Sequence, residues 1–115
     1  MSTLSAILAA VLGIVFLGAG MTKLTGQQQM VDNFERWGYH PSVMTATGAV
    51  ELLAAVLLLV GIAVNALAIT GALLVMFIMA GALMTHTRAK DPLAMFAPPA
   101  VLLVLAVVLL VSMLP

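Results

Sequence analysis

Residues 42–61 read SVMTATGAVELLAAVLLLVG, a stretch that is apolar apart from a few hydroxyls and one carboxylate near its middle, Glu51. A helix of about 20 apolar residues is long enough to cross the hydrocarbon core of a bilayer. An ionisable side chain at that depth is costly unless other parts of the protein satisfy it. We therefore expect this stretch to be a transmembrane helix, with the other segments packed around Glu51.

The composition agrees with a membrane protein. The chain has 115 residues, of which 64% are hydrophobic and 7% charged, whereas soluble domains carry roughly 25% charged residues. The net charge is zero, so the overall charge gives no support to nucleic-acid or acidic-lipid partners. The chain has no cysteine, which excludes disulfides, thiolate metal sites and CxxC redox chemistry. We expect no bound metal and no cofactor motif.

Four apolar runs predict an all-α fold, an integral membrane antiparallel four-helix bundle that forms one transmembrane domain over residues 1–115. The spans are expected at about residues 4–22, 42–61, 66–86 and 93–114. For the first run a cleavable signal peptide is the alternative, but no Lys or Arg precedes it and no clear A-x-A site follows. Its small residues recur at steps of three, four and seven, which predicts a face for close helix packing. These residues are Ala6, Ala10, Gly13 and Gly20.

The longest polar connection, residues 23–40, predicts a short amphipathic helix at about 28–37. Met30, Phe34 and Trp37 recur at helical spacing, with polar residues on the other side, as in a helix that lies in the headgroup region. Trp37 is then an interfacial anchor, although it could instead cover a pocket among the helices.

Two proline-containing segments mark the fourth span. Asp91-Pro92 predicts a helix cap followed by a first-turn proline. Pro98-Pro99 predicts either the start of the fourth helix or a bend near its beginning.

The basic residues predict the orientation in the membrane. All four lie in or beside the two polar connections, and the 61–65 turn and the tails have none. They are Lys23, Arg36, Arg88 and Lys90. The positive-inside rule places loops 23–40 and 86–91 in the cytoplasm and both termini outside, in a multi-pass protein of the cell membrane.

Lys23 and His86 are expected at the same end of the bundle as the start of the span that carries Glu51, with Thr47 one turn before the carboxylate. One interpretation is a polar pocket that opens toward the cytoplasmic interface, where Glu51 and His86 exchange protons or bind a ligand. The alternative is structural. Lys23 then extends to the headgroups, His86 lies among them, and a neutral Glu51 bonds to Thr47 or to a backbone carbonyl.

Several short motifs, taken together in order and spacing, resemble the DoxX and DoxX-like family. They are FLGAGMTKLTG at 16–26, Phe34, Trp37-Gly38 before Pro41, GAVE at 48–51, Gly61, Ala80 and His86. The resemblance implies a compact four-helix membrane bundle in which Lys23, Glu51 and His86 match recurrent polar positions. It also implies functions linked to quinone-coupled sulfur oxidation, membrane oxidoreductase complexes or, in animal relatives, receptor assembly. The absence of cysteine argues against a self-contained thiol oxidoreductase.

Two hypotheses of function follow. The favoured one is a non-catalytic subunit or assembly factor in the bilayer, which docks on other membrane subunits or on copies of itself. The alternative is a small membrane enzyme or binding protein for a quinone or another lipid-soluble ligand. A closed, dry bundle around Glu51 would favour the first hypothesis, and an apolar cavity that ends at Glu51 and His86 would favour the second.

Overall fold

The computed structural model describes residues 1–115, and all of its regular elements are helices. Four helical segments are long and apolar enough to cross a membrane, the fourth being η1 and α5 together. The elements are α1 (Thr3–Leu24), α2 (Gln28–Arg36), α3 (Pro41–Val60), α4 (Asn65–Arg88), the 3-10 helix η1 (Leu93–Phe96) and α5 (Ala97–Met113). The predicted all-α membrane fold is thus confirmed.

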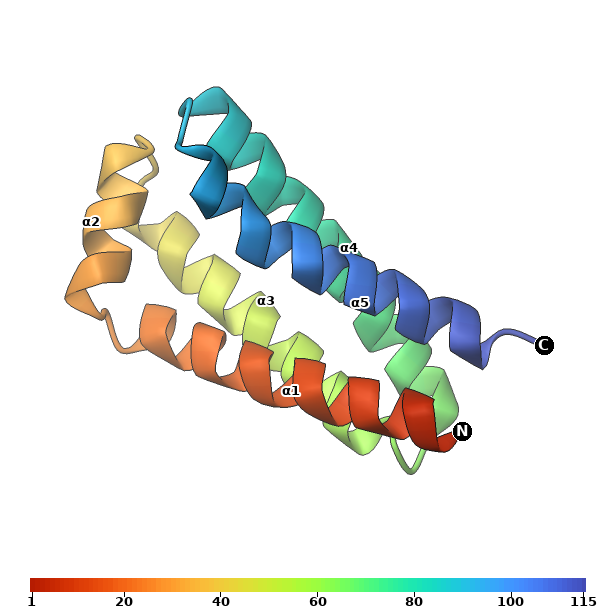
Figure 1. Cartoon of the computed structure of the whole chain (residues 1–115). Coiled ribbons are helices and arrows are strands. Elements are labelled where there is room, and N and C mark those ends of the chain that lie inside the picture. The colour runs from red at the N-terminus through yellow and green to blue at the C-terminus, as the bar shows by residue number, and fades with distance from the viewer.

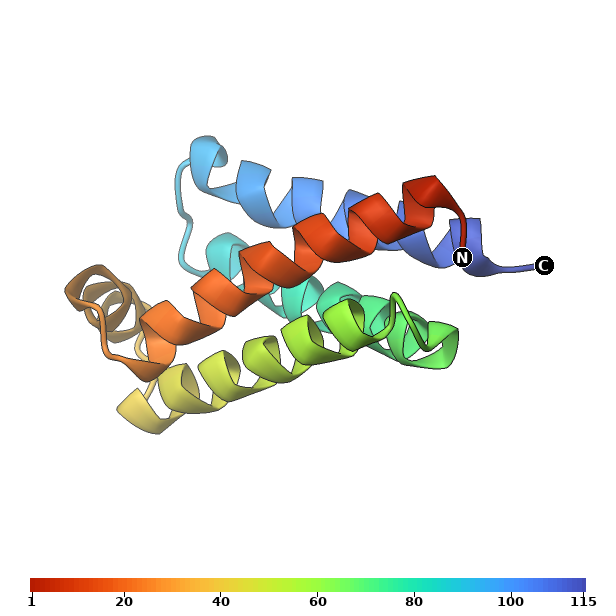
Figure 2. The same ribbon diagram turned by 90° about the horizontal axis from the view of Figure 1, so that it is seen from below.

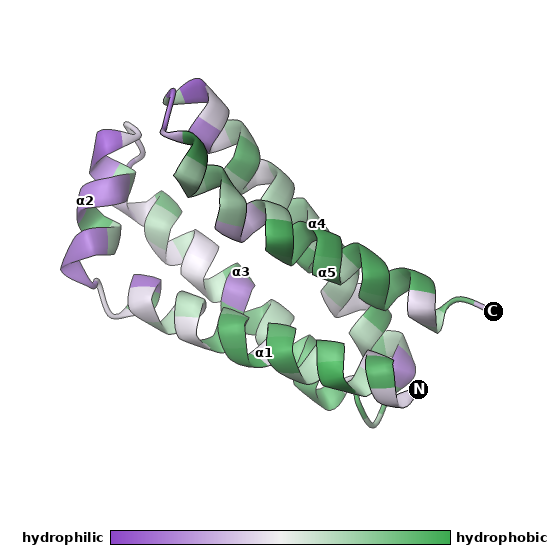
Figure 3. Ribbon diagram, in the orientation of Figure 1, coloured by the Kyte–Doolittle hydropathy of each residue, from purple (hydrophilic) through white to green (hydrophobic).

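The long helices form two pairs (Figures 1 and 2). Helix α1 packs most extensively on α3, and α4 packs on α3 and α5. Both termini lie at one end of the bundle, and α2 crosses the opposite end. Hydrophilic residues gather on α2 and on the turn between α4 and η1, whereas the long helices are mainly hydrophobic (Figure 3).

The hydrophobic core fills the half of the bundle nearer the termini. Its fully buried side chains come from all four long helices, and the largest are Leu12, Phe16, Leu58, Val75 and Leu109. Toward α2 the two helix pairs separate in Figure 1. The core therefore joins the four long helices at the end with the termini, and the two pairs lie farther apart at the end with α2 (Figure 1).

Helices α1 and α3 come closest at two glycines. A Cβ atom added at Gly20 would lie 2.8 Å from the carbonyl oxygen of Gly48, and one added at Gly48 would lie 3.0 Å from the oxygen of Gly20. Gly13 also faces α3, whereas Ala6 and Ala10 are only half-buried. The close approach is thus made by the glycines of the predicted small-residue face.

The polar segments match the predictions except at Asp91. The predicted helix at 28–37 is observed as α2, and it ends before Gly38, whose φ is +81°. Pro98 lies in the first turn of α5, so the prolines start that helix. The predicted cap at Asp91 is wrong, because η1 begins after Pro92 without a side-chain cap and the Asp91 carboxylate bonds to other elements.

The glycine crossing gives a test of the α1–α3 packing. We expect Gly20→Ala to destabilise the protein by about 1–3 kcal/mol, because the new methyl group would meet backbone atoms of α3. Gly18→Ala is the control, since nothing lies within 4 Å of its added Cβ and alanine gains up to about 1 kcal/mol over glycine in a helix. Unfolding in detergent measures both, and equal stability of the two variants would contradict the packing.

Candidate functional site

An ion pair joins α1 to the middle of α3. The Lys23 Nζ lies 2.8 Å from Glu51 Oε1, and the two side chains are 13% and 4% exposed. Glu51 is the eleventh residue of α3, about 15 Å along the helix from its first residue. Oε1 is almost fully enclosed, and its close polar contact is with this lysine. Because a carboxylate has about four lone-pair sites, Glu51 keeps accepting capacity beyond that contact.

The glycine crossing explains how the lysine reaches this depth. Lys23 and Glu51 each follow a crossing glycine by three residues, so both lie near the line where α1 and α3 meet. Lys23 Nζ is also 3.5 Å from the carbonyl oxygen of Ala19, one turn back along α1. The Lys23 side chain thus points into the bundle. The structural alternative, in which it extends to the headgroups, is not observed.

The Thr47 hydroxyl does not serve Glu51. Its Oγ1 donates to the carbonyl oxygen of Val43 at 2.7 Å, within its own helix. The expected alternative of a Glu51–Thr47 hydrogen bond is therefore not observed, and Lys23 is the polar partner of the carboxylate.

A cleft of about 910 Å³ occupies the end of the bundle near α2. It is lined by residues of α1, α2, α3, α4 and α5 together with η1, most of them apolar, and Lys23, Trp37, Thr47, Glu51 and His86 are all among them. Met79 belongs both to the hydrophobic core and to the cleft wall, so the cleft begins where the core ends.

The cleft opens sideways between α3 and α4. Val43 and Val50 of α3 and Phe77 and Gly81 of α4 line it and are exposed. In a bilayer this side of the molecule faces hydrocarbon. A lipid-soluble molecule can therefore reach the cleft without crossing water.

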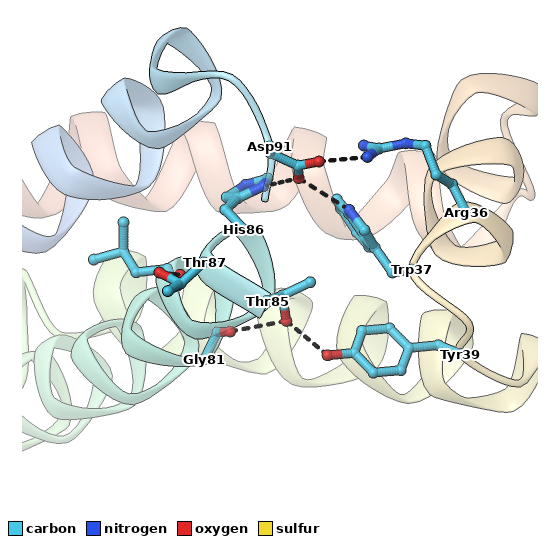
Figure 4. Close-up of polar contacts among 9 residues, drawn as sticks. Arg36, Trp37, Tyr39, Gly81, Thr85, His86, Thr87 and Asp91 are labelled. Carbon is cyan, nitrogen blue, oxygen red and sulfur yellow. Dashed lines mark hydrogen bonds and ion pairs between the residues drawn. The ribbon is translucent and has the colours of Figure 1, made fainter. Parts of the chain in front are cut away.

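His86 pairs with Asp91 and not with Glu51. The His86 Nδ1 lies 2.6 Å from Asp91 Oδ2, and Trp37 Nε1 donates to the same oxygen at 3.1 Å. Arg36 donates to Oδ1. Figure 4 shows the three side chains converging on the carboxylate, which is 1% exposed. One residue of the α4–η1 turn thus joins the C-terminal end of α2 to the end of α4.

The charge of Asp91 is well stabilised. The hydrogen bond from Arg36, followed by the one from His86, lowers the pKa of the Asp91 carboxyl from 3.8 to about 2, and partial desolvation opposes the shift. The carboxylate is therefore ionised throughout the physiological pH range.

Aromatic contacts complete the end of the cleft. Trp37 packs edge-to-face on Phe34 at 5.1 Å and on His86 at 5.5 Å between ring centroids. The Tyr39 hydroxyl hydrogen-bonds to Thr85 Oγ1 at 2.7 Å (Figure 4). Segment 36–39 is thereby attached to α4, and Trp37 is part of the cleft wall.

Sequence reasoning missed the role of Asp91 and Arg36. It treated Asp91 as a helix cap and Arg36 as a topological signal. The sequence did contain a signal for an ion pair at Asp91. The chain has only four acidic and four basic residues, so a carboxylate that precedes an apolar helix has few possible partners.

A family model described as the DoxX-like family matches residues 7–109. The chain belongs to the DoxX-like family. The match extends from the first turns of α1 to the last turns of α5, so it includes both the Lys23–Glu51 pair and the Asp91 cluster. No curated protein and no solved structure matches this DoxX-like chain. Family and apolar helices together identify a multi-pass membrane protein.

The ion pair can be tested by a double-mutant cycle. We expect Lys23→Met to lower stability by about 3 kcal/mol or more, because it leaves a buried carboxylate without its cation. Lys23→Met with Glu51→Gln should recover part of that loss, since no unpaired charge remains. Lys90→Met is the exposed control, expected within about 0.5 kcal/mol of wild type. Additive losses in the double variant would contradict a direct pair.

The Asp91 cluster can be followed by the fluorescence of Trp37, the only tryptophan. The folded pKa of about 2 is below the ordinary 3.8. The ionised carboxylate therefore adds stability that is complete above about pH 4 and is lost as the pH falls toward 2. We expect wild-type emission to stay constant from pH 7 to about 4 and to shift red only below that range.

In Asp91→Asn, the red shift and faster quenching by acrylamide should already be present at pH 7. Asp32→Asn is the matched control, because Asp32 bonds only to Gln28 on the exposed side of α2. Wild-type emission in Asp91→Asn would contradict the proposed attachment of segment 36–39.

Proposed function

We propose that this DoxX-like protein binds a lipid-soluble molecule in the cleft, with the Lys23–Glu51 pair as its polar contact. The observation that carries the proposal is the cleft of about 910 Å³ that has mainly apolar walls and a buried ion pair. Small-molecule sites typically have volumes of about 300–1,000 Å³, apolar linings and a few polar groups. The bundle is not closed around Glu51, which favours a ligand site over a purely structural carboxylate.

The pair suits a ligand head that has both hydrogen-bond donors and acceptors. The Lys23 ammonium can donate to a carbonyl oxygen, and the Glu51 carboxylate in the cleft wall can accept from a hydroxyl. A quinone and its quinol offer these two groups on an apolar ring. A quinone-type molecule is therefore the ligand class that we favour, with its tail directed to the opening between α3 and α4.

The arrangement supports binding more than catalysis. His86 uses Nδ1 to contact Asp91, so it is not paired with Glu51 as an acid–base couple would require. We therefore propose a binding or carrier protein and assign no catalytic residue.

The positions of the basic residues support an orientation for this protein. Lys23, Arg36, Arg88 and Lys90 belong to the end of the bundle that carries α2 and the α4–η1 turn, and the termini lie at the other end (Figure 1). We propose that the first end is cytoplasmic, in accordance with the positive-inside rule.

A second candidate function is that of a membrane subunit or assembly factor. One observation favours it: Gly81 lies at the side opening of the cleft, and nothing is within 4 Å of the position where a Cβ would be. A small residue at an open helix surface permits close approach by another transmembrane helix. A partner helix, from a second copy or another subunit, would then occupy the opening.

Native mass spectrometry with analysis of the bound lipids distinguishes the two functions. Wild type, Glu51→Gln and Glu35→Gln are purified in mild detergent, Glu35 being an exposed residue outside the cleft. We expect a defined small molecule to copurify with wild type and Glu35→Gln, and its occupancy to fall about tenfold in Glu51→Gln, the effect of losing one charge-assisted hydrogen bond.

The opposite result would reject the ligand site. If wild type carries only bulk lipid, and Glu51→Gln changes mainly the oligomer or the copurifying subunits, the carboxylate is structural and the subunit function stands.

A further inference from the structure

A second, smaller pocket lies beside the cleft at the polar end of the bundle. Its volume is about 320 Å³, and it is lined by Arg36, Trp37, Thr85, Arg88 and Ala89. Trp37 and Thr85 also line the cleft, so they form the wall between the two spaces. The pocket is therefore outside the site proposed for the lipid-soluble ligand. Its residues come from the C-terminal ends of α2 and α4, where hydrophilic residues gather in Figure 3.

Two guanidinium groups from different helices flank this pocket, and each is held in place. Arg36 of α2 donates to Asp91 and lies 5.5 Å from the centre of the Trp37 ring. Arg88 of α4 donates to the Tyr39 hydroxyl and lies 5.4 Å from the centre of that ring. Fixed guanidinium groups lose less conformational entropy when they bind an anion than free side chains do.

The arginines retain unused hydrogen-bond donors. Each of these bonds uses one terminal nitrogen, Nη1 of Arg36 and Nη2 of Arg88, whereas a guanidinium has five N–H groups. The Thr85 hydroxyl in the wall donates to the carbonyl oxygen of Gly81, so the free donors are those of the two arginines. The pocket can thus offer several donors from two sides to one group of acceptor oxygens.

The local charge is positive. Asp91 is the partner of Arg36, but Arg88 makes no ion pair, and no carboxylate lines the pocket. Arg36, Arg88 and Asp91 together carry a net charge of +1. An anion in the pocket would therefore be attracted by Arg88, the arginine that has no carboxylate partner.

From these observations we propose that the Arg36–Arg88 pocket binds a phosphate group. Arginine donates paired N–H bonds that match the spacing of phosphate oxygens, and basic pockets at the cytoplasmic ends of transmembrane helices suit phospholipid headgroups. The group can belong to an anionic phospholipid or to free phosphate. This proposal does not depend on the ligand proposed for the cleft.

Native mass spectrometry of the full chain tests the site, with phosphatidylglycerol as the probe and phosphatidylcholine for comparison. We expect wild type to retain phosphatidylglycerol preferentially, and Arg88→Gln to retain it about tenfold less, because one guanidinium contact is lost. Lys90→Gln is the matched control, as it removes the same charge two residues away and outside the pocket. Glu51→Gln should also retain the lipid, which separates this site from the cleft.

The source of the phosphate is decided by a competition arm. If inorganic phosphate displaces phosphatidylglycerol and raises the melting temperature of wild type but not of Arg88→Gln, relative to chloride at equal ionic strength, the ligand is free phosphate. If it does neither, the ligand is the lipid headgroup. Both results support the pocket.

Arg88→Lys guards against misfolding of the glutamine variant. It keeps the charge but cannot form paired hydrogen bonds, so we expect retention of the phosphate ligand between that of wild type and that of Arg88→Gln. The proposal is overturned if Lys90→Gln loses as much ligand as Arg88→Gln, which would indicate diffuse charge. It is also overturned if neither probe distinguishes folded Arg88→Gln or Arg88→Lys from wild type.

Discussion

Two opposite charges inside a bilayer are tolerable only when they stand together, and the contact between Lys23 and Glu51 meets this constraint. The contact requires α1 and α3 to approach closely, which the backbone does at Gly20 and Gly48. It also requires the lysine to turn toward the membrane interior, against the usual preference of such side chains for the headgroup region. The most extensive helix–helix packing of the bundle, between α1 and α3, is therefore organised around one ion pair.

The two ends of the bundle are held together by different interactions. Near the termini, buried side chains such as Leu12, Phe16 and Leu109 fill the core and hold the four long helices together. Near α2 the α1–α3 pair separates from the α4–α5 pair (Figure 1), and polar contacts to the Asp91 carboxylate attach α2 to α4. The buried core near the termini packs the four long helices together, so side chains need not fill the cleft near α2.

The helices could be predicted because the length of an apolar run is a direct physical requirement of the bilayer. The same sequence placed Lys23, Glu51 and His86 at one end, since all three follow from the order of the spans. Their pairing could not be predicted, because it depends on the rotation of each helix about its axis. Asp91 was misassigned for a related reason: Asp-Pro is a strong local capping signal, whereas its actual partner Arg36 is 55 residues away.

The side opening of the cleft, between Val50 of α3 and Phe77 of α4, determines how any occupant would be delivered. A molecule that arrives through this opening diffuses in the plane of the membrane and never becomes free in water. Its occupancy is then governed by its mole fraction among the surrounding lipids, so a compound of negligible aqueous solubility can saturate the protein. The composition of the membrane, rather than that of the cytoplasm, would set the state of this bundle.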